Sequence, residues 1–268
     1  MADIKLSAPV LNHNGLGFES NFELFRQDSI VNRQRFDLKI STSPGGKWRY
    51  QLGFVTTNSS GLSTLITNQK VKVSTNSISL SVSLLPFQNQ GIELNKRALQ
   101  FEFFPTLKKI SDNEGIVSLP QVGYDFNFRY PIKLKSERFN IQTFSRIAGI
   151  LSNQITLQDQ LRTGGNRTIR GFNENAFFGS QICSFTLQPQ YLVDKSFLVG
   201  VFSDLLLINS NLNNQFFKKP STAFGFGIAI ELDFGSNSVQ LSLANGVTSG
   251  IPLDFQATKI HFGYVARF

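Results

Sequence analysis

The stretch GGNRTIRGF, residues 164–172, decides the fold of this 268-residue chain. Strand-like segments flank it on both sides, and it belongs to a connection too long and too rich in glycine to be a simple hairpin turn. Within it, the apolar Ile169 and Phe172 frame the charged Arg170. A buried loop here needs a counter-charge for Arg170, because an unpaired guanidinium is very costly to bury. The sequence therefore predicts a long loop whose place in the fold depends on what pairs with Arg170.

The overall composition argues against a helical membrane protein. The mean hydropathy is −0.08, and the longest apolar run, residues 197–208, is shorter than the roughly 20 residues that a membrane-spanning helix needs. Strands of a membrane barrel are not excluded in this way, because every second residue can face the lumen and be polar. The single Cys183 excludes an internal disulfide framework. The first residues form no basic and apolar leader, so we expect no signal peptide in this sequence, as in a non-exported protein or a mature form.

The chain is basic, with a formal net charge of +8 at pH 7. Such a balance favours acidic partners, nucleic acid or anionic lipid headgroups. The lysines and arginines are scattered along the chain rather than clustered, so we do not expect a nucleic-acid partner.

Apolar and polar residues alternate with a period of two throughout the chain, and helical periodicity is nearly absent. About twelve segments show the alternation, each near the roughly 10 residues of a tilted membrane-spanning strand. They lie near residues 18–24, 36–40, 48–54, 78–84, 99–103, 122–128, 139–148, 183–187, 199–207, 224–232, 239–243 and 260–268. The pattern predicts an all-β chain built on antiparallel strands.

The connections between these segments alternate in length. Short ones lie near residues 43–46, 135–136, 193–195 and 235–237, and longer polar ones near 55–69, 107–117, 149–180, 209–221 and 246–256. Short turns at one rim and long loops at the other are typical of a transmembrane β-barrel of the outer membrane. Counted back from Phe268, both termini fall on the short-turn, periplasmic side. We therefore expect a short periplasmic segment over residues 1–14 and a single barrel over residues 15–268.

A soluble β-sandwich or a barrel with an internal cavity would also alternate. Three features favour the membrane barrel instead. Aromatic residues, including 27 Phe, dominate the apolar faces, the opposite faces carry many charges, and the sequence ends on the aromatic Phe268. A soluble β protein of this size would bury more Val and Leu and expose fewer Phe.

The motif around Arg170 resembles that of the BamA/TamA/FhaC-type superfamily of outer-membrane assembly and translocation barrels. In that family a glycine-rich lead, here Gly164 and Gly165, precedes V/I-R-G-F/Y in a long extracellular loop that folds back into the lumen. A second motif, F-x-D, follows on the second strand after the loop, and residues 202–204 match it. The last strand of the family ends on an aromatic residue, as residues 260–268 do. The matches cover roughly the second half of the chain.

The resemblance implies roles for particular residues. The loop, about residues 149–180, would lie in the lumen, and Arg170 would pair with Asp204. The remaining residues implied in the loop anchor and the closing strand are Gly171, Phe172, Phe202, Gly263 and Phe268. The family also often has an acidic partner on the strand just after the loop, where this chain has Thr186 or Gln188.

Two physical arguments accompany the resemblance. A loop folded into a barrel needs space, and the column Gly225, Gly227 and Ala229 faces inward and leaves some. It also needs an anchor, and breaking a desolvated Arg170–Asp204 pair would cost about 3–5 kcal/mol. In the competing interpretation Arg170 is a solvated loop charge, whose pairing would contribute well under ~1 kcal/mol.

The chain also departs from the family. Members usually have about sixteen strands, roughly four more than this chain has room for. They usually carry periplasmic POTRA domains before the barrel, and residues 1–14 cannot contain one. The resemblance therefore implies a reduced member without POTRA domains.

Nothing in the sequence points to catalysis, a cofactor or a metal. Glu231 and Asp233 would face inward together, but no nucleophile or orienting base accompanies them. His13 and His261 lack the spacing of metal ligands, and no nucleotide-binding or hydrolase motif occurs. Cys183 falls on the apolar face, as an inert lipid-facing residue would.

The implied function is to assist insertion or translocation of a polypeptide, or of lipid, at the bacterial outer membrane, without covalent chemistry. The partners would be outer-membrane lipids, an unfolded outer-membrane or secreted client and a separate periplasmic protein. Gly15, Gly17 and Gly263 would weaken a seam between the first and last strands. The alternative is an anion-preferring pore, or a structural barrel that keeps the loop only for stability. A third class, an outer-membrane enzyme, would need an acid/base cluster that the sequence does not offer.

Overall fold

The computed structural model describes residues 2–8, 16–27, 31–43, 48–62, 70–84, 98–111, 115–166, 168–209, 220–234, 237–250 and 253–266. These residues form one 13-stranded antiparallel sheet and a separate two-stranded sheet. The only helix among them is a single 3₁₀ turn, η1 (Phe255–Ala257), so no described helix is long and apolar enough to cross a membrane.

Each strand of the large sheet pairs with its neighbour in sequence, except that β8 pairs with β11 across the long loop. The strands are β1 (Ala2–Ala8), β2 (Gly17–Gln27), β3 (Val31–Thr42), β4 (Trp48–Leu62), β5 (Lys70–Leu84), β6 (Ala98–Ser111), β7 (Ile116–Lys133), β8 (Phe139–Ser152), β11 (Gln181–Asp194), β12 (Phe197–Asn209), β13 (Ser221–Asp233), β14 (Asn237–Thr248) and β15 (Lys259–Ala266). The small sheet consists of β9 (Leu161–Thr163) and β10 (Phe177–Gly179).

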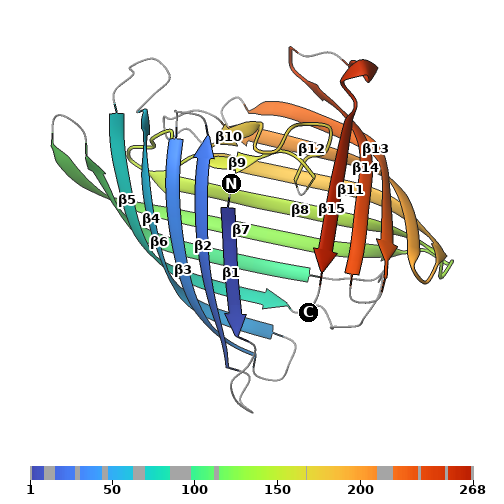
Figure 1. Cartoon of the computed structure of the whole chain (residues 1–268), viewed down its shortest axis with the longest axis horizontal. Helices are drawn as coiled ribbons and strands as arrows, with labels where there is room; N and C mark the ends of the chain where they lie inside the picture. The colour runs from blue at the N-terminus through green and yellow to red at the C-terminus, as the bar shows by residue number, and fades with distance from the viewer. Residues whose placement is uncertain are drawn as a thin grey trace.

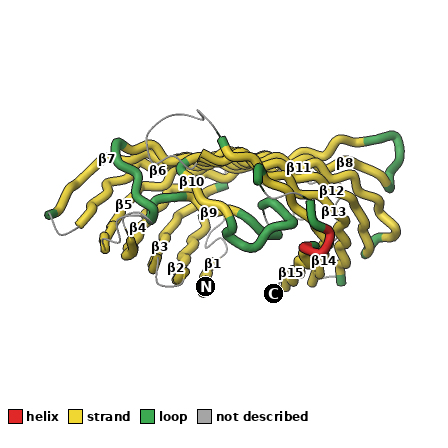
Figure 2. The backbone as a smooth tube through the Cα atoms, turned by 90° about the horizontal axis from the view of Figure 1, so that it is seen from above, coloured by secondary structure: helices red, strands yellow, loops and turns green. Residues whose placement is uncertain are grey.

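The large sheet curves strongly, so that its two edge strands come round to face each other. Figure 1 shows β1 and β15 at the front of the molecule, and Figure 2, seen from above, shows the sheet as an open curve with both edges on one side. Within the described residues β1 pairs only with β2, and β15 only with β14. The loop that carries β9 and β10 lies inside the curve. The structure therefore has a concave inner face, occupied in part by this loop, and a convex outer face.

The predicted all-β architecture is confirmed. Each of the twelve predicted segments corresponds to one strand, from β2 to β8 and from β11 to β15. The sheet has one strand more, β1, which lies within the segment predicted to precede the barrel and pairs with β2. Because the sheet has thirteen antiparallel strands, β1 and β15 run in the same direction, and β1 begins at the rim opposite to the one where β15 ends (Figure 1). The expectation that both termini lie on the short-turn side is therefore wrong for the start of β1. Gly17 was expected on the edge strand, but it lies in β2, which β1 covers. Gly15, His13 and Phe268 lie outside the described residues.

The strands alternate between an exposed apolar outer face and a polar inner face. On β4 and β5, Leu52, Phe54, Ile78 and Leu80 are about half exposed (47–56%) on the outer face. The inner face holds ion pairs whose N–O distances are 2.6–2.8 Å, namely Arg35–Asp37, Lys39–Glu102 and Arg146–Asp125. Buried charges are tolerated when they are paired and hydrogen-bonded. Exposed apolar side chains outside and paired charges inside are the arrangement of a barrel surrounded by lipid.

Several strands extend further than the sequence predicted. The segments 55–69 and 107–117 were expected as loops, but β4 continues to Leu62, β6 to Ser111, and β7 begins at Ile116. The long loop was expected from residue 149, whereas β8 continues to Ser152. These strands extend because the polarity of their two faces reverses toward one rim, which is the upper one in Figure 1. On β5, Val71 and Val73 are buried on the inner face while Lys72 points outward, so the strand continues where its outer face ceases to be apolar.

Candidate functional site

The loop between β8 and β11 crosses the inner face of the sheet (Figure 2). Its C-terminal end is tied to the wall, because Ser180 donates its backbone N–H to Asn209 O at 2.9 Å and accepts from Ile150 N at 2.9 Å. Inside the loop, β9 and β10 pair antiparallel over residues 161–163 and 177–179. Arg162 of β9 lies with its Cζ 5.9 Å from the centre of the Phe178 ring, and burial lowers the pKa of this guanidinium. The loop is thus an ordered element.

The glycines of the motif provide backbone conformations that other residues rarely adopt. Gly164, Gly165 and Gly171 have φ angles of +131°, +88° and +90°. Gly171 is also packed so closely that a Cβ on it would overlap the carbonyl group of Asn245 on β14. A side chain here would be strained and would push the loop off the wall.

Arg170 is joined to Asp204 of β12 by three hydrogen bonds. Its Nε donates to Oδ2 at 2.8 Å, its Nη2 to Oδ1 at 2.8 Å, and its backbone N–H to Oδ2 at 3.0 Å. The exposed fractions of the two side chains are 11% and 2%. A guanidinium and a carboxylate that meet in this two-pronged way form the strongest kind of hydrogen-bonded ion pair. The contact fixes both the backbone and the side chain of the loop to one point on the wall.

Neutral groups complete the surroundings of this pair. Gln188 accepts a 2.9 Å hydrogen bond from Arg170 Nη1, and Thr186 donates one of 2.8 Å to Asp204 Oδ1. The Arg170 guanidinium carbon lies 3.4 Å from the centre of the Phe202 ring, which is a cation–π contact. Thr186 and Gln188 stand where the sequence lacked a second acidic partner, and both supply hydrogen bonds in place of charge.

The three inward residues of β13 that were expected to leave space for the loop have different neighbours. A Cβ on Gly225 would overlap the carbonyl oxygen of Arg170, so this glycine provides space for the loop. A Cβ on Gly227 would instead overlap Leu243 O of β14, so Gly227 allows close approach of the neighbouring strand. Ala229 lies opposite Gly200 of β12 and Ser242 of β14. A glycine that the sequence did not single out, Gly246, faces the Phe172 ring, which a Cβ there would meet at 2.5 Å.

The loop also reaches the last strand. His261 of β15 accepts a hydrogen bond at Nε2 from the backbone N–H of Gly171, at 3.1 Å. Asn166 accepts from Ser242 Oγ of β14 at 3.3 Å, and its Nδ2 would lie 3.4 Å from a Cβ on Gly263. Sequence reasoning set His261 aside because it lacked metal-ligand spacing. The alternation along residues 260–268, which puts odd positions inward, was the signal that it faces the loop.

Part of the loop packs into an apolar cluster on the inner face of the sheet. Ile169 is fully buried, and it packs with side chains of β8, β11, β12 and β13. The cluster consists of Ala148, Ile169, Ile182, Leu206, Ile208 and Ala223, with Leu161, Phe172 and Phe177 at its margin. The Phe172 and Phe177 rings meet edge to face with centroids 4.8 Å apart, as aromatic pairs prefer. Apolar burial and the ion pair therefore act on the same segment.

A second buried ion pair fixes the beginning of the loop, and the sequence analysis missed it. Lys108 of β6 is fully buried and donates from Nζ to Asp159 Oδ2 at 2.7 Å and to the backbone oxygen of Gln154. Asp159 also accepts from the N–H and the hydroxyl of Thr156, both at 2.7 Å. Alternation along β6 puts Lys108 on the inner face and Lys109 on the outer, and this difference could have identified it.

The other candidates gain nothing from the structure. In the part of the chain that the structure describes, no three His, Cys, Asp or Glu side chains lie together as a metal site would require. Glu231 and Asp233 lie at the C-terminal end of β13, where the backbone N–H of Asp233 donates to Ser196 O at 2.8 Å. Cys183 of β11 alternates with the inward Ile182 and Ser184 and so faces outward.

Comparison with known proteins shows similarity in fold only. No protein-family description matches the sequence, and no curated protein matches it either. Among solved structures, BamA from Haemophilus ducreyi lacking POTRA domains 1–3 aligns with a TM-score of 0.64 at 14% identity, covering 98% of this chain and 60% of that one. CdiB from Acinetobacter baumannii gives 0.56 and 11%, covering 98% and 55%, and CdiB from Escherichia coli gives 0.53 and 12%, covering 99% and 59%. The chain therefore spans little more than half the length of these structures and has the fold of a BamA- and CdiB-type barrel.

Proposed function

We propose that this chain is an outer-membrane barrel that assists the insertion or translocation of a polypeptide, or of lipid, without covalent chemistry. The observation that carries the proposal is the loop held inside the sheet by Arg170 and Asp204, on a fold similar to BamA and CdiB barrels. A loop anchored in the lumen obstructs free passage of solutes. Such an obstruction suits a barrel that handles a client at its wall better than one that conducts ions through its centre.

The proposed position in the membrane follows from the outer face. The apolar side chains of that face would contact the hydrocarbon core, and the aromatic Trp48, Tyr50 and Tyr264 would lie toward an interface. The short turns after β7 and β11 would face the periplasm, together with the end of β15, whereas β1 would begin at the opposite rim (Figure 1). The rim from which the long loop enters would then face the outside.

The client would act at the two edge strands. Within the described residues, β1 and β15 pair on one side only, and an edge strand offers unpaired backbone groups to another strand. Gly263, opposite Gln240 in the β14–β15 ladder, adds no side chain that would stabilise this edge. The client would be an unfolded outer-membrane or secreted polypeptide, delivered by a separate periplasmic protein.

A disulfide across the two edges tests this mechanism. One cysteine would be placed in β1 and one in β15, in a Cys183→Ser background, and the locked protein would be reconstituted in liposomes with an unfolded outer-membrane protein as client. The proposal predicts that locking stops client insertion, measured as protease protection, and that reduction restores it. The matched control joins Val239 and Tyr264, which are already opposite each other in neighbouring strands, and should leave insertion unchanged. Full insertion by the locked protein would contradict the mechanism.

The second candidate is a pore that prefers anions, or a structural barrel in which the loop serves only stability. The excess of basic residues and the arginines of the inner face favour an anion pathway if one exists. Single-channel recording separates the two functions: the assembly role predicts a nearly silent barrel, and the pore predicts a large, steady, anion-selective current.

A further inference from the structure

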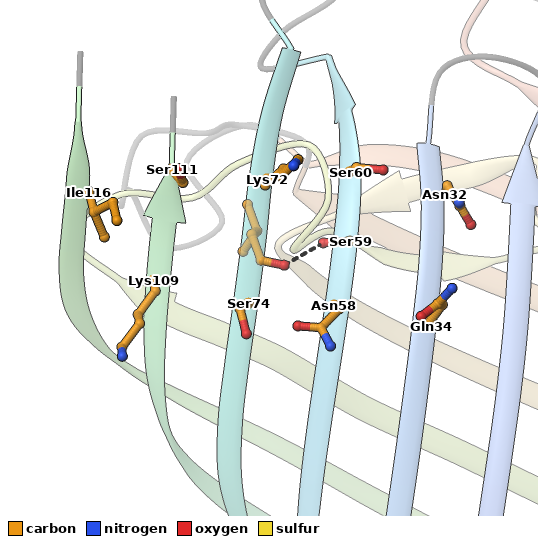
Figure 3. Close-up of a pocket in the computed structure, with 11 residues that line it drawn as sticks. Asn32, Gln34, Asn58, Ser59, Ser60, Lys72, Ser74, Lys109, Ser111 and Ile116 are labelled. Atoms are coloured by element: carbon orange, nitrogen blue, oxygen red, sulfur yellow. Dashed lines mark hydrogen bonds between the residues drawn. The ribbon is translucent and has the colours of Figure 1, made fainter. Parts of the chain in front are cut away.

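The outer face of β3 to β6 changes character near the upper rim. Below the change, Phe36, Phe54 and Ile78 form an apolar band and are 38–53% exposed. Above it, the outward side chains become amides, hydroxyls and amines over at least two successive positions on each strand (Figure 3). We call this surface the polar ledge and define it by Gln34, Asn58, Ser60, Lys72, Ser74 and Lys109.

Strand register aligns the polar ledge into rows. Gln34 is opposite Asn58, Asn58 is opposite Ser74, and Ser74 is opposite Lys109. In the next row Ser60 is opposite Lys72. Side chains opposite each other across antiparallel strands lie about 5 Å apart, so these groups form one continuous surface. It lines a concavity of about 640 Å³, within the range of about 300–1,000 Å³ that is usual for small-molecule sites.

The charge of the polar ledge is uniformly positive among the described residues. Lys72 and Lys109 are exposed and belong to neighbouring strands. No described residue forms a salt bridge with either amine, and no carboxylate is found among the described residues that line the concavity. The other four members of the ledge carry amides or hydroxyls, which are donors and acceptors suited to the hydroxyl groups of a sugar. The surface thus combines two cations for a phosphate with neutral groups for a sugar.

The position of the polar ledge relates it to the membrane. Its lower row lies one cross-strand row above Asn76 and Leu107, which are opposite each other on β5 and β6. Leu107 is 68% exposed on the outer face, directly beside the polar groups. An amphiphile could place its acyl chains along the apolar band and its headgroup on the ledge, because the two surfaces are continuous.

We propose that the polar ledge binds the phosphorylated sugar headgroup of an anionic glycolipid in the outer leaflet. Lys72 and Lys109 contact the phosphate, and Asn58, Gln34 and the serines contact the sugar. Attraction of basic side chains to anionic headgroups contributes about 1 kcal/mol for each lysine near the surface. The inference rests on the proposed function only for the placement of the barrel in a membrane, since it makes no use of the Arg170 loop.

The test measures binding of a diphosphorylated acyl-disaccharide to the purified full chain in phosphatidylcholine nanodiscs, by native mass spectrometry. The variant Lys72→Gln/Lys109→Gln should reduce binding about tenfold or more. The control variant Lys135→Gln/Lys195→Gln removes the same charge at exposed positions of the opposite rim and should leave binding within about twofold of wild type. The dephosphorylated disaccharide should bind to wild type as weakly as the phosphorylated one binds to the ledge variant.

Three results would overturn the proposal: equal loss in both variants, equal binding of the dephosphorylated probe, or competition by inorganic phosphate at concentrations near that of the glycolipid. Incorporation of the wild-type chain into nanodiscs is scored separately, as is client insertion by the Arg170 loop variants. A chain that inserts clients yet ignores the glycolipid contradicts the ledge alone, and a chain that binds the glycolipid but inserts no client contradicts the assembly role alone.

Discussion

Gly171, in the loop, donates its backbone N–H to Nε2 of His261, on the last strand, across a separation of 90 residues. The same loop is joined to Asp204 by the neighbouring Arg170. The two contacts connect the loop to β12 and to the edge strand β15 at once. A shift of β15 would therefore disturb the Arg170–Asp204 pair, and a displaced loop would lose its contact with β15.

Replacing His261 tests the link to the edge strand. His261→Ala removes the acceptor and leaves the Gly171 N–H without its partner, which should lower the free energy of unfolding by about 1–3 kcal/mol. His261→Gln offers an amide oxygen in its place and should recover part of the loss. Urea titration of the barrel in detergent, followed by tryptophan fluorescence, measures both. Equal stability of all three proteins would show that the contact contributes nothing.

Gly225 tests whether the loop needs the space on β13. Gly225→Val puts a side chain where the Arg170 carbonyl lies, and because both groups are backbone-bound, the loop must move away. We expect rapid protease cleavage within residues 153–180, which the wild type should resist. The control is Gly263→Ala, whose Cβ would approach nothing closer than 3.4 Å. Cleavage of the control at the same rate would contradict the packing argument.

Lys108 tests the second anchor. Lys108→Met leaves Asp159, 3% exposed, as an uncompensated buried charge, and such a loss costs about 3–5 kcal/mol. Faster amide hydrogen exchange should appear in residues 153–160. Lys109→Met changes the adjacent residue, which points outward, and should leave exchange in that segment unaffected. Adding Asp159→Asn to Lys108→Met should slow the exchange again, because the unpaired charge is gone. If the exchange does not slow, the charge of Asp159 does not determine the stability of this segment.

The loop should also determine conductance. Wild type in a planar bilayer should be nearly silent, because the loop lies across the lumen. Deleting residues 154–178 and closing the gap with a short glycine linker should give a large current that favours anions. If the wild type already conducts as strongly as the deletion variant, the chain is a pore and the proposed role is wrong.

The sequence predicted the strands well wherever one face was continuously apolar, as from Phe224 to Leu232. It failed at strand ends such as residues 71–74 and 109–111, where the outer face becomes polar and the inner face apolar. Polar and apolar residues still alternate there, but the apolar ones face inward. A search for apolar residues at the outward positions therefore misses these strand ends. The first strand, β1, was missed because residues 2–8 form a short segment, which within the described part of the chain pairs with β2 alone.

The sequence predicted part of the candidate site. The resemblance to the assembly and translocation barrels implied that Arg170, Phe202 and Asp204 act together, and the structure places the Arg170 side chain in contact with both of the others. The neutral partners Thr186 and Gln188 could not be assigned, because hydroxyl and amide groups occur on every strand. Lys108 and Asp159 were not paired because they are 51 residues apart and no spacing rule connects them.

The most direct test of the central claim is a double-mutant cycle with Arg170→Asp and Asp204→Arg, read as unfolding free energy in detergent. Each single variant buries two like charges and should lose about 3–5 kcal/mol. The double variant should recover at least about 2 kcal/mol of the summed loss, though not all of it, because Asp204 also accepts from the Arg170 backbone and Thr186. Losses that simply add in the double variant would contradict the anchoring of the loop by this pair.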